Sequence, residues 1–166
     1  MRRQRIVFLW ISIVFLLSLV IFISVSFKPV EAAARYITLK PTDDTYVALE
    51  YPSSNYGTQT GLVAATGYMV RPFRGFTDVV WLKFNLSSIP DGAAIANATL
   101  SLYAYSLDGV SQPIDAHSCT NTSWSELTLT YSSMPSYNST SMGTVQVTTL
   151  NQWYNWGVVD AARNAM

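Results

Sequence analysis

The chain is poor in the residues from which disulfide frameworks and many catalytic sites are built. Its 166 residues include one cysteine, Cys119, and one histidine, His117. A single cysteine forms no intrachain disulfide, so we expect Cys119 to be a small, buried apolar side chain. One histidine beside one cysteine makes neither a zinc site nor a histidine-dependent triad. The sequence also has no glycine-rich phosphate loop and no nucleophile elbow.

Charged residues are scarce as well, at 12% of the chain, and their formal sum is zero. Basic residues gather at the N-terminus, whereas from Arg35 onward six Lys or Arg stand against nine Asp or Glu, a net charge of about −3. Nucleic-acid binding depends on neutralising phosphate charge with basic side chains. A weakly acidic domain therefore gives no electrostatic reason to expect a nucleic-acid partner.

Residues 6–27 form an uncharged apolar run of 22 residues. The run exceeds the usual core of a signal peptide and is long enough to span a bilayer, while Ala32 and Ala34 behind it fit a signal-peptidase site. We therefore predict that residues 1–34 are a signal peptide or an uncleaved signal anchor, and both remain open. Either way, residues 35–166 are expected to be secreted or extracellular, with membrane contact through residues 6–27 if the leader is kept.

The rest of the sequence has the pattern of short strands separated by turn residues. Apolar and polar residues alternate over 79–86 and again over 98–105, with a turn cluster at 87–92, which predicts a hairpin. Its core side is expected to carry Val80, Leu82, Phe84, Leu86, Leu100 and Leu102. Further strands are expected at 36–40, 45–51, 61–66, 114–119, 127–131 and 144–148, before a short C-terminal helix.

Many short strands with turn signals between them predict an all-β protein. We expect an antiparallel β-sandwich of jelly-roll type over residues 35–166, preceded by an N-terminal hydrophobic helix. The late tryptophans, Trp153 and Trp156, are expected to pack in the core or at its edge.

The outward side of the predicted hairpin carries Trp81, Lys83, Tyr103 and Tyr105. Aromatic faces stack on the C–H surfaces of sugars, and polar side chains bond the sugar hydroxyls. These four residues are a candidate ligand-binding platform if their face is open to solvent. The alternative is that a loop covers the aromatics, or that they pack as cross-strand pairs without any ligand.

Two further groups of polar residues are weaker candidates. Arg71 and Arg74 would match the carboxylates of an acidic glycan, although plain surface charge also explains them. Asp43, Asp44 and Asn55 carry oxygen ligands of the kind that Ca²⁺ prefers, so a structural calcium ion is the cofactor that they suggest. Asp and Asn are also ordinary turn residues, and no EF-hand spacing is present.

Five short motifs share an order and spacing that resemble the DNRLRE-domain proteins, over about residues 36–166. That family overlaps with carbohydrate-binding module family 96 and the disaggregatase-related repeats of archaea. The motifs are Asp44-Thr45-Tyr46-Val47, then Asn55-Tyr56-Gly57, then Trp81 to Pro90, then Ala98 to Tyr103, and then Trp124-Ser125-Glu126 with Leu129-Thr130-Tyr131 and Pro135.

The resemblance implies a jelly-roll sandwich on secreted or cell-surface proteins, often beside catalytic domains, with a polysaccharide-binding role. Trp124 and Glu126 belong to the shared signature, and we expect Trp124 to fill the core while Glu126 caps a backbone group. The family continues through a short helix into closing strands, whereas this sequence ends at Met166. A C-terminally truncated domain, or part of a longer product, is therefore expected.

The sequence thus predicts a non-catalytic carbohydrate-binding module with a polysaccharide as its partner. The alternative is a structural or adhesive surface module that makes protein contacts through an open sheet edge. A carboxylate pair for glycoside hydrolysis is defined by its separation in space, and the sequence gives no positive sign of one.

Overall fold

The computed structural model describes residues 34–69, 74–107 and 111–166. The chain divides into two units, Met1–Tyr36 and Ile37–Met166, and the elements below belong to the second. The apolar run at residues 6–27 and the side chain of Arg71 lie outside the described residues. Within the described ranges, no helix has both the length and the apolar character needed to cross a membrane.

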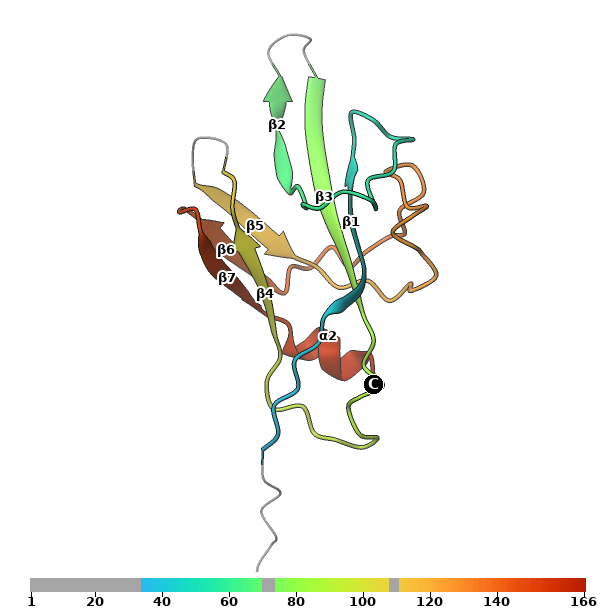
Figure 1. The fold of residues 1–166 in the computed structure, drawn as a ribbon, viewed down its shortest axis with the longest axis vertical. Coiled ribbons are helices and arrows are strands. Elements are labelled where there is room, and N and C mark those ends of the chain that lie inside the picture. The colour runs from blue at the N-terminus through green and yellow to red at the C-terminus, as the bar shows by residue number, and fades with distance from the viewer. Residues whose placement is uncertain (1–33, 70–73, 108–110) are drawn as a thin grey trace, which may run out of the picture. The chain divides into compact units, whose positions relative to one another are not determined.

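Strands dominate the described part of the second unit, and they form antiparallel pairs (Figure 1). This confirms the all-β class, while the jelly-roll arrangement stays a prediction and the N-terminal helix falls outside the described residues. The elements are β1 (Pro41–Ala48), β2 (Ala65–Met69), β3 (Arg74–Phe84), β4 (Thr99–Ala104), β5 (Gln112–Ala116), β6 (Gly143–Val147), β7 (Gln152–Gly157) and helix α2 (Val159–Asn164).

The described strands form one three-stranded sheet, in the order β1-β3-β2, and two two-stranded sheets, β4-β7 and β5-β6. The predicted hairpin between the strand at 79–86 and the strand at 98–105 is therefore wrong. The first of these strands pairs with β1 and β2, whereas the second pairs with β7. Turn residues locate where a chain leaves a strand, but they do not decide which strand it pairs with next.

Two other predicted strands are not strands. Pro41 begins β1 instead of ending a strand at 36–40, because a proline is tolerated at the first position of a strand. Residues 127–131 lie in turns and irregular loop, where the backbone N–H groups of Thr128 and Leu129 both donate to the carbonyl oxygen of Ser125, at 3.1 and 2.9 Å.

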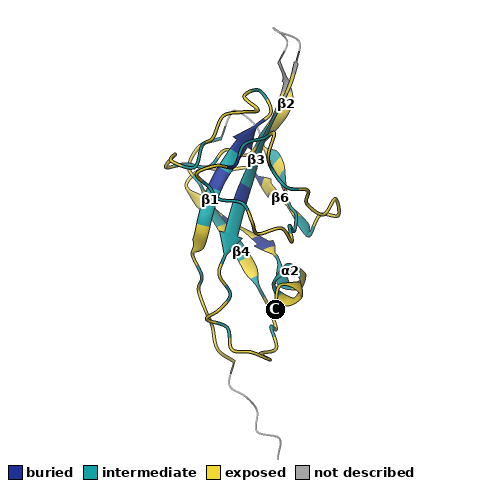
Figure 2. Cartoon of the chain, turned by 90° about the vertical axis from the view of Figure 1, so that its right-hand side faces the viewer, coloured by how far each residue is buried: buried dark blue, intermediate teal, exposed yellow. Residues whose placement is uncertain are grey.

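One core cluster lies against the β1-β3-β2 sheet, where Val47 and Trp81 pack with Leu129 from the loop that follows β5. Trp81 is only 5% exposed, so its expected place on an open platform is wrong, and the covered alternative holds. The covering side chains come from that loop, and they include Cys119, Trp124, Tyr131 and Met134. Figure 2 shows buried segments on both β1 and β3.

A second core cluster is shared by β4, β5, β6 and β7. Its buried members are Val147, Tyr154 and Trp156, and the Trp156 indole N–H donates to the carbonyl oxygen of Ile114 at 2.9 Å. Leu100 and Leu102 pack against this cluster, as predicted from their alternation. Leu82, Phe84 and Leu86 are half-buried and stand outside both clusters.

Candidate functional site

The two-stranded β4-β7 sheet presents one side to its core cluster and the other to solvent. Along β4, exposed and half-buried residues alternate from Thr99 to Ala104, because successive side chains of a strand point to opposite faces (Figure 2). The antiparallel register fixes which residues of β7 share the open side. This β4-β7 outer face consists of the cross-strand pairs Thr99 with Gly157, Ser101 with Asn155, and Tyr103 with Trp153.

Two aromatic rings stand side by side on the β4-β7 outer face. Trp153 is 64% exposed and Tyr103 is 45% exposed. Their ring centroids lie 5.4 Å apart with an interplanar angle of 65°, an edge-to-face contact. Such a contact stabilises the pair and limits the freedom of both rings. The strands therefore hold two aromatic surfaces in fixed positions while leaving them open to a ligand.

Polar groups follow the aromatic pair along the same face. The Ser101 hydroxyl donates to the Asn155 side-chain oxygen at 2.6 Å. This bond orients the Asn155 amide, whose nitrogen has no protein partner among the residues that the structure describes. Two residues along a strand span about 7 Å, so the amide donors lie about that far from the aromatic pair.

Tyr105 follows the end of β4 and is 59% exposed. Its hydroxyl lies so close to Gly61 that a Cβ atom at position 61 would overlap it. The absence of a side chain at Gly61 thus lets the loop before β2 approach the Tyr105 ring. Tyr103 and Tyr105 are both exposed, as the sequence analysis expected.

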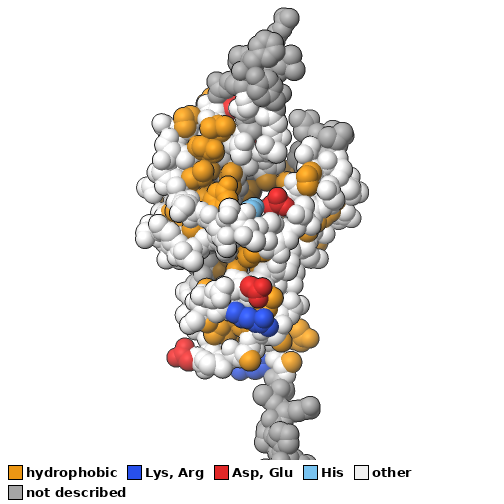
Figure 3. Space-filling model, turned by 180° about the vertical axis from the view of Figure 1, so that it is seen from behind, with side chains coloured by type: hydrophobic (Ala, Val, Ile, Leu, Met, Phe, Trp, Pro, Cys, Tyr) orange, Lys and Arg blue, Asp and Glu red, His pale blue; other side chains and the backbone are white. Residues whose placement is uncertain are grey.

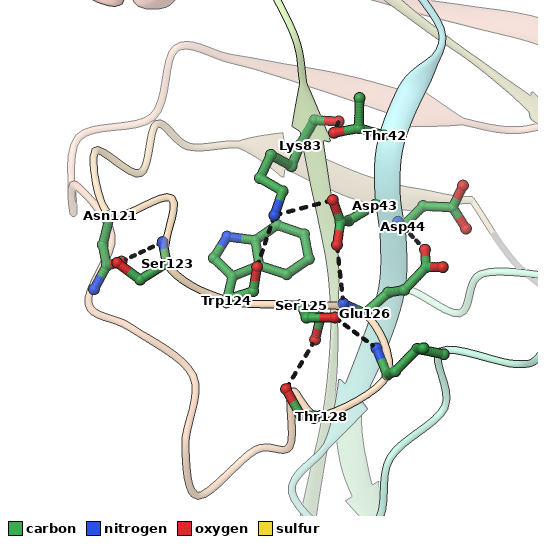
Figure 4. A network of polar contacts seen from close by, with 11 residues as sticks. Thr42, Asp43, Asp44, Lys83, Asn121, Ser123, Trp124, Ser125, Glu126 and Thr128 are labelled. Carbon is green, nitrogen blue, oxygen red and sulfur yellow. Dashed lines mark hydrogen bonds and ion pairs between the residues drawn. The ribbon is translucent and has the colours of Figure 1, made fainter.

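Lys83 was expected on an open platform beside Trp81, but it is bound within the protein. Its Nζ lies 2.9 Å from the Asp43 carboxylate, donates to the Trp124 carbonyl oxygen at 2.7 Å, and stands 4.9 Å from the centre of the Trp124 ring (Figure 4). The hydrogen bond from Lys83 lowers the pKa of Asp43 below its ordinary value of 3.8, against the effect of burial. The amine is thus occupied by intramolecular partners.

Glu126 and Asn55 complete this network, which we call the motif network: Asp43, Asn55, Lys83, Trp124 and Glu126. The Asp44 backbone N–H donates to the Glu126 carboxylate at 2.8 Å, and the Asn55 amide donates to the carbonyl oxygens of Glu126 and Leu129 at 2.6 and 2.7 Å. The expected role of Glu126 as a backbone cap is confirmed, whereas Trp124 is half-buried and packs against the core cluster without being one of its buried members.

The predicted calcium ligands fit a metal ion poorly. Asp43 faces Lys83, and the Asn55 side-chain oxygen accepts from the Gly57 N–H at 3.2 Å, as in an ordinary Asx turn. Figure 4 shows the Asp44 carboxylate on the opposite side of β1 from that of Asp43, as neighbouring residues of a strand require. Within the described ranges, no group of three His, Cys, Asp or Glu side chains is placed to hold a metal ion.

The two arginines proposed for an acidic glycan stay untested. Arg71 lies outside the described residues, and Arg74 is described as the first residue of β3 without its side-chain surroundings. Figure 3 shows that charged side chains are sparse on the face of the molecule seen from behind, where hydrophobic side chains gather in strips.

Two other surface features lie outside the β4-β7 outer face. An open depression of about 440 Å³ is lined by residues at the ends of β1 and β3, including Thr42, Lys83 and Asn85. Its one cationic group, Lys83, is already paired with Asp43.

The second feature is the carboxyl group of Asp78. Burial raises the pKa of Asp78, and the nearby Glu50 carboxylate raises it further. Neither feature combines exposed aromatic rings with polar donors, as the β4-β7 outer face does.

Trp153 and Asn155 are the members of this face that the sequence reasoning missed. Trp153 was expected to pack in the core or at its edge with Trp156, yet the two lie on opposite sides of β7, with Trp156 only 4% exposed. The signal was present, since Gln152 to Gly157 places Trp153 and Asn155 two apart and Tyr154 and Trp156 two apart. That alternation marks a half-buried strand, with one tryptophan on each side.

Comparison with known protein families places the whole second unit in one of them. Residues 35–166 match the family model described as carbohydrate-binding module family 96. A comparison with curated proteins gave no match. The match spans most of the chain, including every strand described above. The chain therefore belongs to carbohydrate-binding module family 96.

Proposed function

We propose that this chain is a non-catalytic polysaccharide-binding module of a secreted or cell-surface protein, and that it binds its ligand on the β4-β7 outer face. Family membership supports carbohydrate binding. The apolar run at residues 6–27 behind an arginine-rich start supports export. Membrane contact, if the leader is retained, is through that run.

The exposed Tyr103–Trp153 pair is the observation that carries the choice of site. Adjacent exposed aromatic rings form an apolar patch of the kind that often marks a binding surface, and sugar rings present C–H faces of matching size. The neighbouring Asn155 amide and Ser101 hydroxyl supply the directional bonds that stacking lacks. The remaining exposed aromatics of the described chain have no comparable polar row defined by strand register.

Removing the aromatic pair tests the site directly. We expect Trp153→Ala and Tyr103→Ala in the full chain each to weaken retention in affinity electrophoresis through gels containing polysaccharides by at least about tenfold, as loss of a central aromatic contact does. Both side chains are exposed, so the circular dichroism spectrum and the cooperative thermal transition should persist. Unchanged retention in both variants would overturn the assignment of the site.

Tyr51→Ala is the matched control. Tyr51 is 60% exposed, close to the value for Trp153, but it lies outside the β4-β7 sheet. We expect this variant to bind like the unaltered chain. If Tyr51→Ala and Trp153→Ala lose retention equally, general surface hydrophobicity explains the binding and the site is wrong.

The competing functions give different results in the same samples. A structural or adhesive module would associate with itself in sedimentation experiments and would show no retention by any polysaccharide in the gel. A hydrolase or lyase would release new sugar ends on prolonged incubation. We expect polysaccharide retention without such release, because the β4-β7 outer face carries no Asp, Glu, His, Lys or Arg for acid–base chemistry.

A further inference from the structure

We propose that Asn85, Asn121 and Asn138 are attachment sites for N-linked oligosaccharides in the folded domain. This inference goes beyond the proposed polysaccharide binding and rests only on the export of residues 35–166, because such oligosaccharides are attached to exported chains. It is carried by the local geometry that three Asn-x-Ser/Thr sequences share and a fourth lacks.

The chain contains four Asn-x-Ser/Thr sequences, and in none of them is the middle residue a proline. They are Asn85-Leu86-Ser87, Asn97-Ala98-Thr99, Asn121-Thr122-Ser123 and Asn138-Ser139-Thr140. In all four, the asparagine and the Ser or Thr two positions on are exposed. Exposure therefore does not distinguish the four sequences, and the local backbone has to do so.

Three of the four sequences form an Asx turn, in which the asparagine side chain binds the backbone two residues on. The asparagine Oδ1 accepts from the backbone N–H of Ser87, Ser123 and Thr140, at 2.9, 2.9 and 3.0 Å respectively. The turn brings the hydroxyl-bearing residue back beside the carboxamide. A transferase has to hold the amide and the hydroxyl together, so the turn supplies in advance an arrangement that would otherwise cost conformational entropy.

Asn55 shows the same turn used for the fold instead. Its Oδ1 accepts from the Gly57 N–H, but its Nδ2 donates to two carbonyl oxygens of the covering loop, and Gly57 carries no hydroxyl. Within the part of the chain that the structure describes, the side-chain nitrogens of Asn85, Asn121 and Asn138 donate to no protein group. Figure 4 shows the Asn121 nitrogen directed away from the motif network. Each carboxamide is thus held by its oxygen while its nitrogen stays available.

Asn97 differs because it leads directly into a paired strand. The Val158 N–H donates to the Ala98 carbonyl oxygen at 2.9 Å, and Thr99 pairs with Gly157 on β7. Residues two apart in an extended segment lie about 7 Å apart, and this pairing keeps the segment from bending into an Asx turn. We therefore expect Asn97 to stay unmodified, which also leaves the β4-β7 outer face beside Thr99 uncovered.

The three proposed sites lie away from the β4-β7 outer face. Asn85 directly follows β3, whereas Asn121 and Asn138 belong to the loop that follows β5 and covers the β1-β3-β2 sheet. The backbone of Asn138 is anchored on both sides, since its N–H donates to the Ser118 carbonyl oxygen at 2.8 Å and its carbonyl oxygen lies 2.9 Å from the His117 Nδ1. Oligosaccharides at these positions would cover the loop side of the domain and leave the ligand face open.

The modification is a displacement at the anomeric carbon of the transferred sugar. The donor is an oligosaccharide joined to a lipid phosphate, and a separate transferase catalyses the step. A bond forms between the asparagine Nδ2 and the anomeric carbon, while the bond from that carbon to the phosphate oxygen breaks. The lipid phosphate leaves with the bonding electron pair, and the amide loses one proton to a base of the transferase, so nothing is oxidised or reduced.

Intact-mass spectrometry of the exported chain tests the sites. The full chain would be produced in a host that N-glycosylates exported proteins after they have folded, and its mass compared before and after enzymatic removal of N-linked oligosaccharides. We expect a species carrying three oligosaccharides. Asn85→Gln, Asn121→Gln and Asn138→Gln should each lower that number by one, and the triple variant should carry none. Asn97→Gln is the matched control and should leave the number unchanged.

Two substitutions at Thr140 test one site without touching its asparagine. The backbone N–H that binds Asn138 remains in both Thr140→Ala and Thr140→Ser, but only serine keeps the hydroxyl. We expect Thr140→Ala to lose the oligosaccharide at Asn138 and Thr140→Ser to retain it.

The outcomes separate this inference from the proposed function. An exported chain without oligosaccharides, or one modified at Asn97 as fully as at the other positions, would overturn the inference and leave polysaccharide binding standing. A chain that stays in the cytoplasm would overturn the export part of the proposed function, and this inference with it.

Discussion

Trp81 shows how one tryptophan can be assigned to the wrong side of a strand. The alternation in β3 places Val80 and Leu82 on one face of the strand and Trp81 and Lys83 on the other. The face of Val80 and Leu82 is the more apolar one, so the sequence predicts that it is the buried face. Trp81 is nevertheless buried, because the loop after β5 covers its face of the strand. The rings of Trp124 and Tyr137 in that loop make edge-to-face contacts with the Trp81 ring, with ring centroids 5.9 and 6.2 Å apart. Alternation defines two faces, and the covering loop decides which one is buried.

Tyr154 is a second residue whose role depends on its surroundings. Its hydroxyl accepts from the backbone N–H groups of Thr148 and Thr149, at 3.0 and 2.8 Å, and donates to the Thr149 carbonyl oxygen at 2.9 Å. The Gln152 side-chain amide also donates to the Tyr154 hydroxyl, at 2.5 Å. The loop between β6 and β7, in which Asn151 has a positive φ of 59°, is thus held by one phenol group. Burial raises the pKa of Tyr154, but the hydrogen bonds from Gln152, Thr148 and Thr149 outweigh it and lower the pKa to about 8.

We expect one tyrosine of the folded chain to ionise near pH 8, and Tyr154→Phe to remove that step from an ultraviolet titration of tyrosinate. The pKa of Tyr154 in the folded chain lies below the ordinary value of 10.0, so ionisation of Tyr154 stabilises the folded state. This contribution to the free energy of unfolding grows as pH rises from about 8 to 10 and is lost as pH falls through 8. Titration of every tyrosine at or above its ordinary pKa would contradict this. The same titration in denaturant is the control, since unfolding should restore the ordinary value.

At the scale of elements, β4 and β7 form the candidate site through their register. Tyr103 and Trp153 are fifty residues apart in sequence, and a shift of one residue in the pairing would place Trp153 opposite Leu102 or Ala104 and turn it toward the core side. The second core cluster fixes the register, because Tyr154 and Trp156 fill it from the other side of β7. Tyr103 and Trp153 are therefore exposed side by side because Tyr154 and Trp156 are buried on the other side of the sheet.

The motif network joins β1 and β3 to the loop that covers them. Lys83 reaches from β3 to Asp43 on β1 and to the Trp124 carbonyl oxygen in the loop. Gly57 adds a close approach, since a Cβ atom there would overlap the Glu126 carbonyl oxygen. The bonds between strand and loop therefore hold the cover over Trp81 in place.

The ion pair in this network predicts a pH dependence. Lys83 lowers the pKa of Asp43 below 3.8. The ionised Asp43 carboxylate therefore contributes to stability above pH 3.8, and this contribution is lost as pH falls through the lowered pKa. Asp43→Asn should reduce the free energy of unfolding at neutral pH by about 1 kcal/mol and should make unfolding less sensitive to acid. Chemical denaturation between neutral and acidic pH measures both effects.

Lys83→Met is the companion variant, because it keeps much of the packing over Trp124 while removing the charge. It should reproduce the smaller acid sensitivity of Asp43→Asn, and the double variant should add little. Equal acid sensitivity in the unaltered chain and both variants would mean that the pair makes no contribution to the stability of the fold.

For the molecule as a whole, the family motifs lie mostly away from the candidate site, and only the motif Ala98 to Tyr103 contributes to it. Four of the five motifs supply residues of the motif network or of the core beside it, and the fourth in chain order supplies β4. The motifs that made the resemblance recognisable thus mainly maintain the fold. If the β4-β7 outer face binds the ligand, as we propose, its exposed residues Trp153 and Asn155 can vary with the ligand without disturbing that fold.

The same separation predicts that the fold does not depend on calcium. Because Asp43 is paired with Lys83 and the Asn55 oxygen caps Gly57, an ion at this position would have to displace both partners. We expect the temperature of unfolding to be equal in excess Ca²⁺ and in chelator, as measured by differential scanning calorimetry. A lower unfolding temperature in chelator would instead identify a structural metal ion.

The sequence by itself determined the all-β class, the family, the two sides of β4 and the capping role of Glu126. These follow from period-two alternation, from turn residues and from motifs that are local in the chain. Tertiary structure alone decided that β4 pairs with β7, that Trp81 is covered, and that Trp153 stands beside Tyr103. Partner choice and cover depend on packing between segments far apart in sequence, and no local pattern records them.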